Sequence, residues 1–472
     1  MRLFVDRARL AGLALGAVLL SGSYARASDQ TLIQRGAYLA RAADCVACHT
    51  KPGSAAFAGG YGIKSPLGVI YSSNITPSRT YGIGGWSEAA FVAALREGRS
   101  ADGHRLYPAM PYDSYAGMSD DDIHALYAYM TTRIAPVDKA VEPMTALRFP
   151  YNWRSLMRLW NWLYLDHKRF APRPDETPLQ ARGRYLVENV AHCGTCHTPR
   201  NFMMASKAGH KLEGATLGGW YAPDIAAGEN GPLASWRDDE IMTYLHNGHV
   251  RDKAVAAGPM GEAVEHSLRY LTHDDLAAIA SFLREHKRSA RAGQPVGAVS
   301  ATARLYAVDS ASDRETRNLA RQERDADPAP YADRRNYRDI AGGAALYVAA
   351  CASCHQLDGA GTPDDFYPSL RLSRTVRAQR PDNLVMTIMA GVNRQGADRT
   401  AHMPAFRHDL TDRQILALVR FVTRHLAGTD TTLTEAEVAR LRTLDTEDFP
   451  AQSLPPGSAA LNEKNANQTR TP

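Results

Sequence analysis

Apolar residues recur along this chain at helical spacing, and three stretches repeat the same arrangement. In each stretch they occupy positions i, i+3, i+4 and i+7, which places one apolar stripe along a helix. The three stripes are Ile123, Leu126, Tyr127 and Met130; Leu276, Ile279, Ala280 and Leu283; and Ile415, Leu418, Val419 and Val422. No run alternates convincingly enough between apolar and polar residues to argue for a sheet, so the pattern predicts mainly helical units.

A helix start signal precedes each stripe. It consists of a hydroxyl residue followed three positions later by a carboxylate or an amide, as in a capped helix N-terminus. The three signals are Ser119 with Asp122, Thr272 with Asp275, and Thr411 with Gln414. Further helix-forming segments lie upstream, around Tyr38-Leu39, Tyr185-Leu186 and Leu346-Tyr347.

These repeats divide the 472 residues into three small helical units. With about 150 residues in a typical domain, a chain of this length is also expected to contain three domains. The predicted units are residues 28–145, 176–288 and 339–428; a connector rich in aromatic and basic residues covers 146–175, a polar extended linker 289–338, and a C-terminal tail 429–472. The end of the tail, from about Gln452, is rich in Pro, Asn and Thr and is expected to be disordered. It contains no amphipathic or Trp-rich segment.

The N-terminus has the features of a cleaved secretory signal over residues 1–27. Arg2, Arg7 and Arg9 precede an apolar run from Leu10 to Leu20, and a small-x-small site follows at residues 25–27. The alternative, a membrane anchor, needs about 20 apolar residues. No later stretch is long and apolar enough to span a bilayer, so any membrane attachment is expected to be peripheral or through a partner.

Composition and charge narrow the class of protein. Hydrophobic residues make up 44% and charged residues 22% of the chain, which is ordinary globular usage and excludes disordered and collagen-like proteins. The formal charge is +5, of which the predicted signal contributes +3. The net charge that remains after removal of the signal is small and gives no support for nucleic-acid binding.

All six cysteines belong to three CxxCH motifs, whose first cysteines are 148 and 158 residues apart. The motifs are Cys45, Cys48 and His49; Cys193, Cys196 and His197; and Cys351, Cys354 and His355. In a helical turn the two thiols and the imidazole share one face. Two thiols at that spacing can add to the two vinyl groups of a haem while the histidine reaches the iron, so each motif predicts one covalently bound haem c, three in all.

Two other kinds of site also use CxxC pairs. A zinc site needs four ligands, usually from two CxxC pairs that lie close in sequence. A thioredoxin-like dithiol would explain one CxxC pair but not the histidine that follows every pair.

The second axial ligand of each iron is expected to be one of the 13 methionines. Met110, Met260 and Met403 each lie beside a proline, in a predicted loop shortly before a capped helix, and are the candidates. Methionines elsewhere are expected to pack in the core, as Met130 and Met389 do on apolar helix faces. The competing side chains are Met118, Met203 and Met204, with His104, His266 and His402 as possible second histidines; His266 follows the second candidate closely.

From about Ile33 to His425, the chain resembles the triple-haem cytochrome c subunit of bacterial membrane-bound alcohol, gluconate or sorbitol dehydrogenase complexes. The matching segments are Gly36–Arg41, Asp44–His49, Ser73–Pro77, Leu106–Tyr112, His192–Arg200, Gly258–Met260, Glu265–Ser267 and Met403–Pro404. The resemblance implies three tandem class I cytochrome c-like domains, with Met110, Met260 and Met403 as the sixth ligands. It also implies that Asn74–Pro77 and Pro223–Ile225 line the first two haem pockets.

The same resemblance implies a partner and a location. Family members pass electrons from a quinoprotein (PQQ), flavin or molybdenum dehydrogenase subunit towards ubiquinone, at the periplasmic face of the bacterial inner membrane. A haem held by both His and Met has no open position, which favours electron transfer over substrate binding, and Met/His ligation favours a raised potential. No phosphate loop, dinucleotide fingerprint or nucleophile elbow occurs, so catalysis is expected in the partner.

Two other functions use several haems in one chain: that of a multihaem peroxidase, which would leave one iron open, and that of a soluble electron shuttle with no fixed partner. The shuttle would leave the connector unexplained. In that connector Trp160, Trp162 and Tyr164, with Arg158 and Arg169, either pack beneath the first two units or form a surface for a partner or for lipid headgroups.

Overall fold

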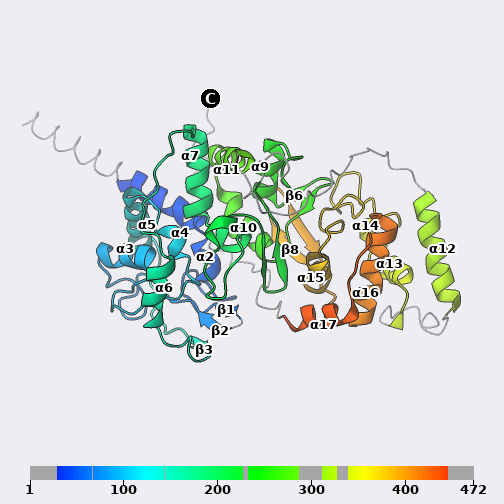
Figure 1. Ribbon diagram of the computed structural model, residues 1–472, viewed down its shortest axis with the longest axis horizontal. Coiled ribbons are helices and arrows are strands. Elements are labelled where there is room, and N and C mark those ends of the chain that lie inside the picture. The colour runs from blue at the N-terminus through cyan, green and yellow to red at the C-terminus, as the bar shows by residue number, and fades with distance from the viewer. Residues whose placement is uncertain are drawn as a thin grey trace, which may run out of the picture.

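The computed structural model describes residues 29–65, 67–142, 144–226, 232–285, 311–326 and 339–444. The predicted signal peptide and the end of the tail lie outside the described residues. The chain runs from the blue N-terminal part at one end of the molecule, through the green middle, to the orange C-terminal part (Figure 1). We refer to residues 29–132, 177–285 and 339–426 as the first, second and third CxxCH segments.

The first segment contains a helix over residues 29–42, then α2 (Cys45–Cys48), β1 (Gly62–Ser65), β2 (Gly68–Tyr71), α3 (Glu88–Glu97), α4 (Tyr112–Tyr115) and α5 (Asp120–Thr132). The connector to the second segment carries β3 (Ala146–Leu147) and α6 (Leu156–Tyr164).

The second segment begins with α7 (Pro178–Tyr185), the π-helical turn η1 (Leu186–Val190) and α8 (Gly194–His197). It continues with the turn η2 (Ala208–His210), β4 (Ala215–Leu217), β5 (Trp220–Ala222), α9 (Asp238–Asn247), β6 (His249–Val250), β7 (Ala254–Val255), α10 (Gly258–His266), the turn η3 (Leu268–Tyr270) and α11 (His273–Glu285).

The third segment is preceded by α12 (Ala311–Ala326) and followed by α17 (Glu435–Thr443). It contains α13 (Gly343–Ala350), α14 (Ala352–His355), α15 (Asp382–Ala390), β8 (Val392–Gln395), β9 (Thr400–Met403), α16 (Asp412–Phe421) and the π-helical turn η6 (Val422–Leu426). The fold is mainly helical, as predicted.

The three predicted helix caps are confirmed. The Ser119 hydroxyl accepts the Asp122 amide at 3.1 Å at the start of α5, and the Thr272 hydroxyl accepts the Asp275 amide at 3.2 Å at the start of α11. Thr411 forms a reciprocal capping box with the third residue of α16. Each cap satisfies backbone amides that have no partner within the helix.

A glycine lets two helices cross closely in every segment. A methyl group on Gly183 of α7 would lie 1.9 Å from the carbonyl oxygen of Ala278 and 2.8 Å from Cβ of Phe282 on α11. The same arrangement occurs where Gly36 meets Ala125 and Tyr129 of α5, and where Gly343 meets Ala417 and Phe421 of α16. The helix before each CxxCH motif therefore packs on the capped helix after it in the same way three times.

The apolar core has two main parts. One buried cluster runs continuously through the first and second segments, and the other fills the third. Trp220 belongs to the second segment, yet its side chain is buried in the cluster of the third. A smaller cluster lies beneath the connector, around Tyr112 and Trp160.

The mainly helical fold also contains short strands, for which no run of the sequence argued. Four small antiparallel sheets are present in the described residues: β1-β2-β3, β4-β5, β6-β7 and β8-β9. In the longest hairpins Gly62 pairs with Tyr71, and Val392 with Met403. Strands of two to four residues are too short for an alternating pattern to show in the sequence.

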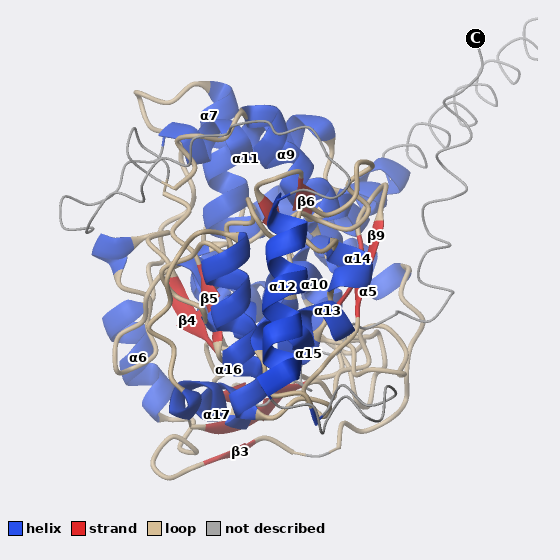
Figure 2. Cartoon of the chain, turned by 90° about the vertical axis from the view of Figure 1, so that its right-hand side faces the viewer, coloured by secondary structure: helices blue, strands red, loops and turns tan. Residues whose placement is uncertain are grey.

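Two regions predicted to be a linker and a tail contain helices. Helix α12 packs against α13 at the outer end of the third segment, where it faces the viewer in Figure 2. The Glu323 carboxylate accepts the amide of Ala345 at 2.8 Å and so caps α13. Helix α17 is held to α16 by an ion pair of Arg442 with Asp412 at 2.6 Å. Both helices are mostly polar and bury only a few side chains, so neither has the apolar stripe by which the other helices were predicted.

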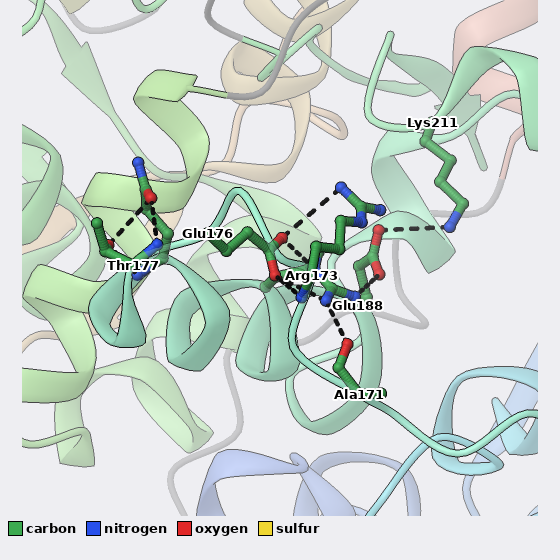
Figure 3. Close-up of polar contacts among 8 residues, drawn as sticks. Ala171, Arg173, Glu176, Thr177, Glu188 and Lys211 are labelled. Atoms are coloured by element: carbon green, nitrogen blue, oxygen red, sulfur yellow. Dashed lines mark hydrogen bonds and ion pairs between the residues drawn. The ribbon is translucent and has the colours of Figure 1, made fainter.

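An ion pair holds the residues just before α7 to the last turn of that helix (Figure 3). The buried guanidinium of Arg184 contacts Glu176 at 2.5 Å and donates to the Ala171 carbonyl at 2.8 Å. Thr177 caps α7 through a reciprocal capping box. In the part of the chain that the structure describes, no helix combines the length and apolar character needed to cross a bilayer.

Candidate haem-binding sites

Each CxxCH motif lies on a single helical turn, as the spacing predicts. The turn is closed by a hydrogen bond from the histidine amide to the carbonyl of the first cysteine, and this bond is 3.0 Å long in all three motifs. The first cysteine, the second cysteine and the histidine therefore project from one face of the turn. The three turns are α2, α8 with the preceding Cys193, and α14 with the preceding Cys351.

The six cysteines form no disulfide with one another, and their surroundings do not fit a redox dithiol. Burial raises the pKa of Cys45, Cys193 and Cys351 to about 12. A reactive dithiol needs a lowered thiol pKa. Across the described ranges, no three His, Cys, Asp or Glu side chains gather as a zinc site would require. Neither alternative to haem attachment is supported.

The three motif histidines are oriented alike by backbone carbonyl groups. Nδ1 lies 2.7 Å from the Ser73 carbonyl oxygen in His49, 2.7 Å from that of Pro223 in His197, and 3.0 Å from that of Pro368 in His355. A carbonyl oxygen only accepts hydrogen bonds, so Nδ1 carries the proton in each ring and Nε2 keeps a lone pair. This second-sphere arrangement is typical of a metal-ligating histidine.

Burial also lowers the pKa of all three imidazoles. The neutral form, which binds metals, is therefore favoured at neutral pH. Ser73 and Pro223 stand in or next to the two loops that the family resemblance assigned to the first two haem pockets, so these loops do lie beside the motif histidines.

The three candidate methionines share a relationship that the sequence analysis missed. Helices α3, α9 and α15 each end at a glycine with positive φ, and a candidate methionine lies twelve residues after that glycine. The pairs are Gly98 with Met110, Gly248 with Met260, and Gly391 with Met403. A short antiparallel pairing lies between the two members of each pair. This constant spacing could have been found in the sequence.

The sequence predicted that all three methionines lie in loops, but their local structure differs from one site to the next. Met110 lies in a turn before α4, Met260 in the first turn of α10, and Met403 at the end of β9. All three side chains are half-buried. Met118, Met130 and Met389, by contrast, are fully buried core residues.

Four of the competing residues lie at exposed positions or in a separate turn. His104 is exposed and pairs with Asp102 at 2.5 Å, and His402 is also exposed. Met203 and Met204 belong to a turn whose carbonyl groups accept hydrogen bonds from Trp160 and Arg200.

His266 needs separate consideration, because it is only 2% exposed and its ring nitrogens have no hydrogen-bond partner among the described residues. Burial, with Arg41 and Arg269 nearby, lowers its pKa to about 4. The next residue, Ser267, donates to the Ala42 carbonyl at 3.1 Å. His266 therefore lies at the boundary with the first segment, and it stays open as an alternative ligand to Met260.

The first two motifs are neighbours in space. Helix α10, which carries Met260, packs against α2. Burial raises the pKa of Cys48, and negative charge on Asp44, Glu262 and Cys196 would add to this effect. The first two CxxCH turns therefore lie on the same side of the boundary between the first two segments as α10.

Two thiols and an imidazole with a fixed tautomer, on one helical turn, are the attachment groups of a c-type cytochrome. Comparison with known proteins agrees. The family model described as "Cytochrome C oxidase, cbb3-type, subunit III" matches residues 31–130 and 338–422.

Similar proteins extend over almost the whole chain. The fructose dehydrogenase cytochrome subunit of Gluconobacter japonicus is 40% identical over 90% of this chain and 87% of its own. The gluconate 2-dehydrogenase cytochrome c subunit of Pantoea cypripedii is 36% identical, with 91% and 94% covered. The cytochrome c subunit of the quinone-dependent alcohol dehydrogenase of Gluconobacter oxydans is 32% identical, with 92% and 87% covered. The chain belongs to this family of dehydrogenase cytochrome c subunits, which confirms the resemblance, and its cofactor is covalently bound haem c.

Proposed function

We propose that this chain carries electrons from a catalytic dehydrogenase subunit through three covalently bound haem c groups to ubiquinone. The observation that carries the proposal is the threefold repetition of one site: a CxxCH turn, a histidine Nδ1 held by a carbonyl, and a methionine twelve residues after a helix-ending glycine. No comparable repetition would be needed to bind one substrate.

The proposed site residues are those that the sequence indicated. The cysteine pairs of each motif would hold the haem edge, and His49 with Met110, His197 with Met260, and His355 with Met403 would ligate the three irons. Haem c supplies reversible one-electron oxidation and reduction. With a histidine and a methionine as ligands, each iron would have no position left for a substrate.

The three repeated helix crossings support three tandem class I cytochrome c-like domains. Their boundaries remain the predicted ones, residues 28–145, 176–288 and 339–428. The packing of α10 against α2, and the burial of Trp220 in the core of the third segment, support a continuous path for electrons through all three.

The family supports the partner. The named relatives belong to dehydrogenases of fructose, gluconate and alcohol, so the proposed partner oxidises an alcohol, sugar or aldehyde with a PQQ, flavin or molybdenum cofactor. Catalysis then resides in the partner and not in this chain. We place the complex at the periplasmic face of the inner membrane, after removal of residues 1–27, with peripheral attachment.

Haem content tests the proposal directly. The holoprotein, matured with the c-haem attachment machinery, should carry three haems that acid–acetone does not extract, by mass and by pyridine haemochrome assay. Replacing both cysteines of one motif by alanine (Cys45 and Cys48, Cys193 and Cys196, or Cys351 and Cys354) should remove one covalent haem each time. Bound zinc, or fewer than three covalent haems in the unaltered protein, would contradict it.

The partner is tested by reconstitution. A dehydrogenase encoded next to this chain should reduce its haems when the dehydrogenase substrate is added, and ubiquinone should reoxidise them. The class of dehydrogenase found there would identify the electron donor.

A further inference from the structure

The candidate methionines of the second and third sites lie at the ends of two similar chain segments. Each segment runs from a helix-ending glycine to the methionine. We call residues 98–110, 248–260 and 391–403 the first, second and third methionine arms. The second and third arms are neighbours, because β8 of the third arm packs against α10, which begins at the end of the second.

The tip of the third arm lies against the start of the second arm. The side-chain oxygen of Asn247, the last residue of α9, accepts the Asp398 amide at 2.9 Å, and its side-chain nitrogen donates to the Asp398 carboxylate at 3.2 Å. The Ala397 amide donates to the His246 carbonyl at 3.2 Å. A methyl group on Gly396 would lie 2.6 Å from the Asn247 carbonyl oxygen. The two backbones are therefore in contact where the second arm begins.

A buried arginine of the third arm crosses the second arm. Arg394 is 4% exposed, and its guanidinium donates to the carbonyl of Ala256, four residues before Met260. A methyl group on Gly248 would lie 2.6 Å from Nε of Arg394. Glu265, on α10, is a nearby counter-charge for this guanidinium. Arg394 therefore contacts both the first residue of the second arm and the backbone that leads to its methionine.

A buried aspartate connects both arms to the histidine side of the third site. The Asp365 carboxylate lies 2.6 Å from Nε2 of His249 in the second arm and 3.4 Å from Nη1 of Arg399 in the third arm. Three residues later, the Pro368 carbonyl orients His355. One carboxylate thus joins the two arms and the loop that holds a motif histidine.

The ends of the two arms face one common space. Gly258, two residues before Met260, lines a cavity of about 230 Å³ together with Met403. Trp220 forms the wall beside Gly258, where a side chain would overlap the indole. The second and third arms are therefore in contact at the start of the second arm and meet again near the two methionines.

The first arm has a different neighbour. The connector holds it through a hydrogen bond from Nη1 of Arg154 to the Arg105 carbonyl at 2.8 Å. Gly103 and Gly396 each lie five residues after the first glycine of their arm. A methyl group on Gly103 would meet no atom within 4 Å, whereas one on Gly396 would meet the second arm. The first arm is thus held by the connector, and the other two hold each other.

We propose that the second and third methionine arms act as one unit, so that the contact between them positions the axial methionines of both irons. Asn247, Gly396 and Asp398 are then positioning residues for two sites that they do not ligate. The inference rests on the proposed function, which makes Met260 and Met403 ligands. Packed interfaces have discrete arrangements and do not deform continuously, so opening this contact should affect both sites together.

The consequence concerns the electron path. A thioether ligand favours ferrous iron and raises the reduction potential. The potentials of the second and third haems would therefore be fully established only when the third segment is docked, and the second site would be incomplete without it. The first haem, whose methionine arm is held by the connector, should keep its potential when the other two arms separate.

The main variant is Gly396→Ala in the holoprotein, which inserts a methyl group between the arms at a position without a positive φ. Gly209→Ala is the matched control, because nothing lies within 4 Å of its added methyl group. A milder test is Asn247→Asp, which brings two carboxylates together. Adding Asp398→Asn to it exchanges the two side chains and restores both hydrogen bonds.

The measurements are haem content, the three midpoint potentials from spectroelectrochemical titration, and the near-infrared sulfur-to-iron charge-transfer band. Met260→Leu and Met403→Leu, which preserve the shape of each arm, assign the potentials to their sites. Gly396→Ala should keep three haems, lower the potentials of both the second and the third site and weaken the band. Asn247→Asp should lower the same two potentials less, and the double variant should restore them. Gly209→Ala should change none, and the first potential should stay constant throughout.

A potential that changes at only one of the two sites, or at neither, would overturn the inference and leave the proposed function intact. Where Gly396→Ala loses haem, Asn247→Asp and its double variant decide by the same criteria. If Met260→Leu leaves every potential unchanged, Met260 is not a ligand and the inference fails. Fewer than three covalent haems in the unaltered protein would instead contradict the proposed function.

Discussion

The phenolic hydroxyl of Tyr185 donates a hydrogen bond of 2.5 Å to the carboxylate of Asp122, 63 residues earlier in the chain. The reciprocal contact is present as well, because the Tyr38 hydroxyl donates to Asp275 at 2.5 Å. Each tyrosine lies in the helix before one CxxCH motif, and each aspartate is the third residue of the capped helix in the other segment. The first two segments are therefore joined by a pair of equivalent contacts around one continuous core.

Loss of either hydroxyl should weaken this junction. Tyr38→Phe and Tyr185→Phe are each expected to lower the free energy of unfolding by about 1–2 kcal/mol, because a buried carboxylate loses a charge-assisted hydrogen bond. The two sites are separate, so their effects should add approximately in the double variant. Denaturant unfolding of the holoprotein measures this, with the exposed Tyr81→Phe as the control. A double variant as stable as the parent would contradict it.

The same tyrosines should make the protein sensitive to alkali. Burial first, and then the neighbouring aspartate, raises the pKa of Tyr38 and Tyr185 to about 12, from an ordinary value of 10. The folded state therefore holds these protons more tightly than the unfolded state, so the stabilisation is complete below pH 10 and is lost as the pH rises towards 12. Between pH 10 and 12 the double Phe variant should lose less stability than the parent. Equal losses would show that other groups govern alkaline unfolding.

The sequence identified the features that depend on nearby residues. A cap such as Ser119 with Asp122, or a motif such as Cys45 to His49, is specified within five residues, and these predictions were confirmed as local structure. Tyr38 and Asp275 are 237 residues apart, and nothing in either neighbourhood indicates the other. Helix α12 was not predicted either. It is polar and little of it is buried, so it forms mainly through its contact with α13.

A glycine at each helix crossing should be irreplaceable. Gly183→Ala would place a methyl group 1.9 Å from the Ala278 carbonyl oxygen, so α7 and α11 would have to separate. Overpacking of this kind costs about 1–3 kcal/mol. Gly209→Ala is the matched control, because nothing lies within 4 Å of the added methyl group and its φ is not positive. Thermal unfolding and haem content compare the two, and equal stability would refute the close crossing.

Replacement of each proposed axial methionine should change one haem only. Met110→Leu, Met260→Leu and Met403→Leu should each leave one iron five-coordinate and lower its potential, because a thioether favours ferrous over ferric iron. The near-infrared sulfur-to-iron charge-transfer band should fall by about one third in each variant, as expected for one of three Met/His-ligated haems. Met118→Leu, at a fully buried core position, is the control that should leave the band intact.

The second site has its own decisive comparison. If the band persists in Met260→Leu and the spectrum changes instead in His266→Ala, the buried histidine is the ligand and the methionine assignment fails there. If the band is lost in Met260→Leu and kept in His266→Ala, Met260 is the ligand and His266 is excluded.

Two tryptophans of the connector, Trp160 and Trp162, were expected to have the same role, but their surroundings in the structure differ. Trp160 is 2% exposed, and its indole Nε1 donates to the Met203 carbonyl at 2.9 Å, so it belongs to the core beneath the first two segments. Trp162 is 78% exposed. It shares the outer face of α6 with Leu159 and Leu163, both about half exposed.

Substitution should therefore distinguish these two roles within one helix. Trp160→Ser is expected to cost about 3–5 kcal/mol of stability, the loss typical of removing a large buried aromatic side chain. Trp162→Ser should change stability by less than about 0.5 kcal/mol, because little of its surface is buried.

If the outer face of α6 contacts a dehydrogenase or the lipid surface, Trp162→Ser should impair coupling while folding stays normal. An aromatic side chain beside Arg158 suits such an interface, since its ring is buried on contact while the basic group stays hydrated. The measurements are quinone-reductase activity of the reconstituted complex and co-sedimentation with vesicles that contain anionic lipid. Reduced sedimentation would assign the face to lipid, and reduced activity with unchanged sedimentation would assign it to the dehydrogenase. Normal values in both assays would mean that this exposed apolar face has no part in coupling, and the interface should then be sought on another surface.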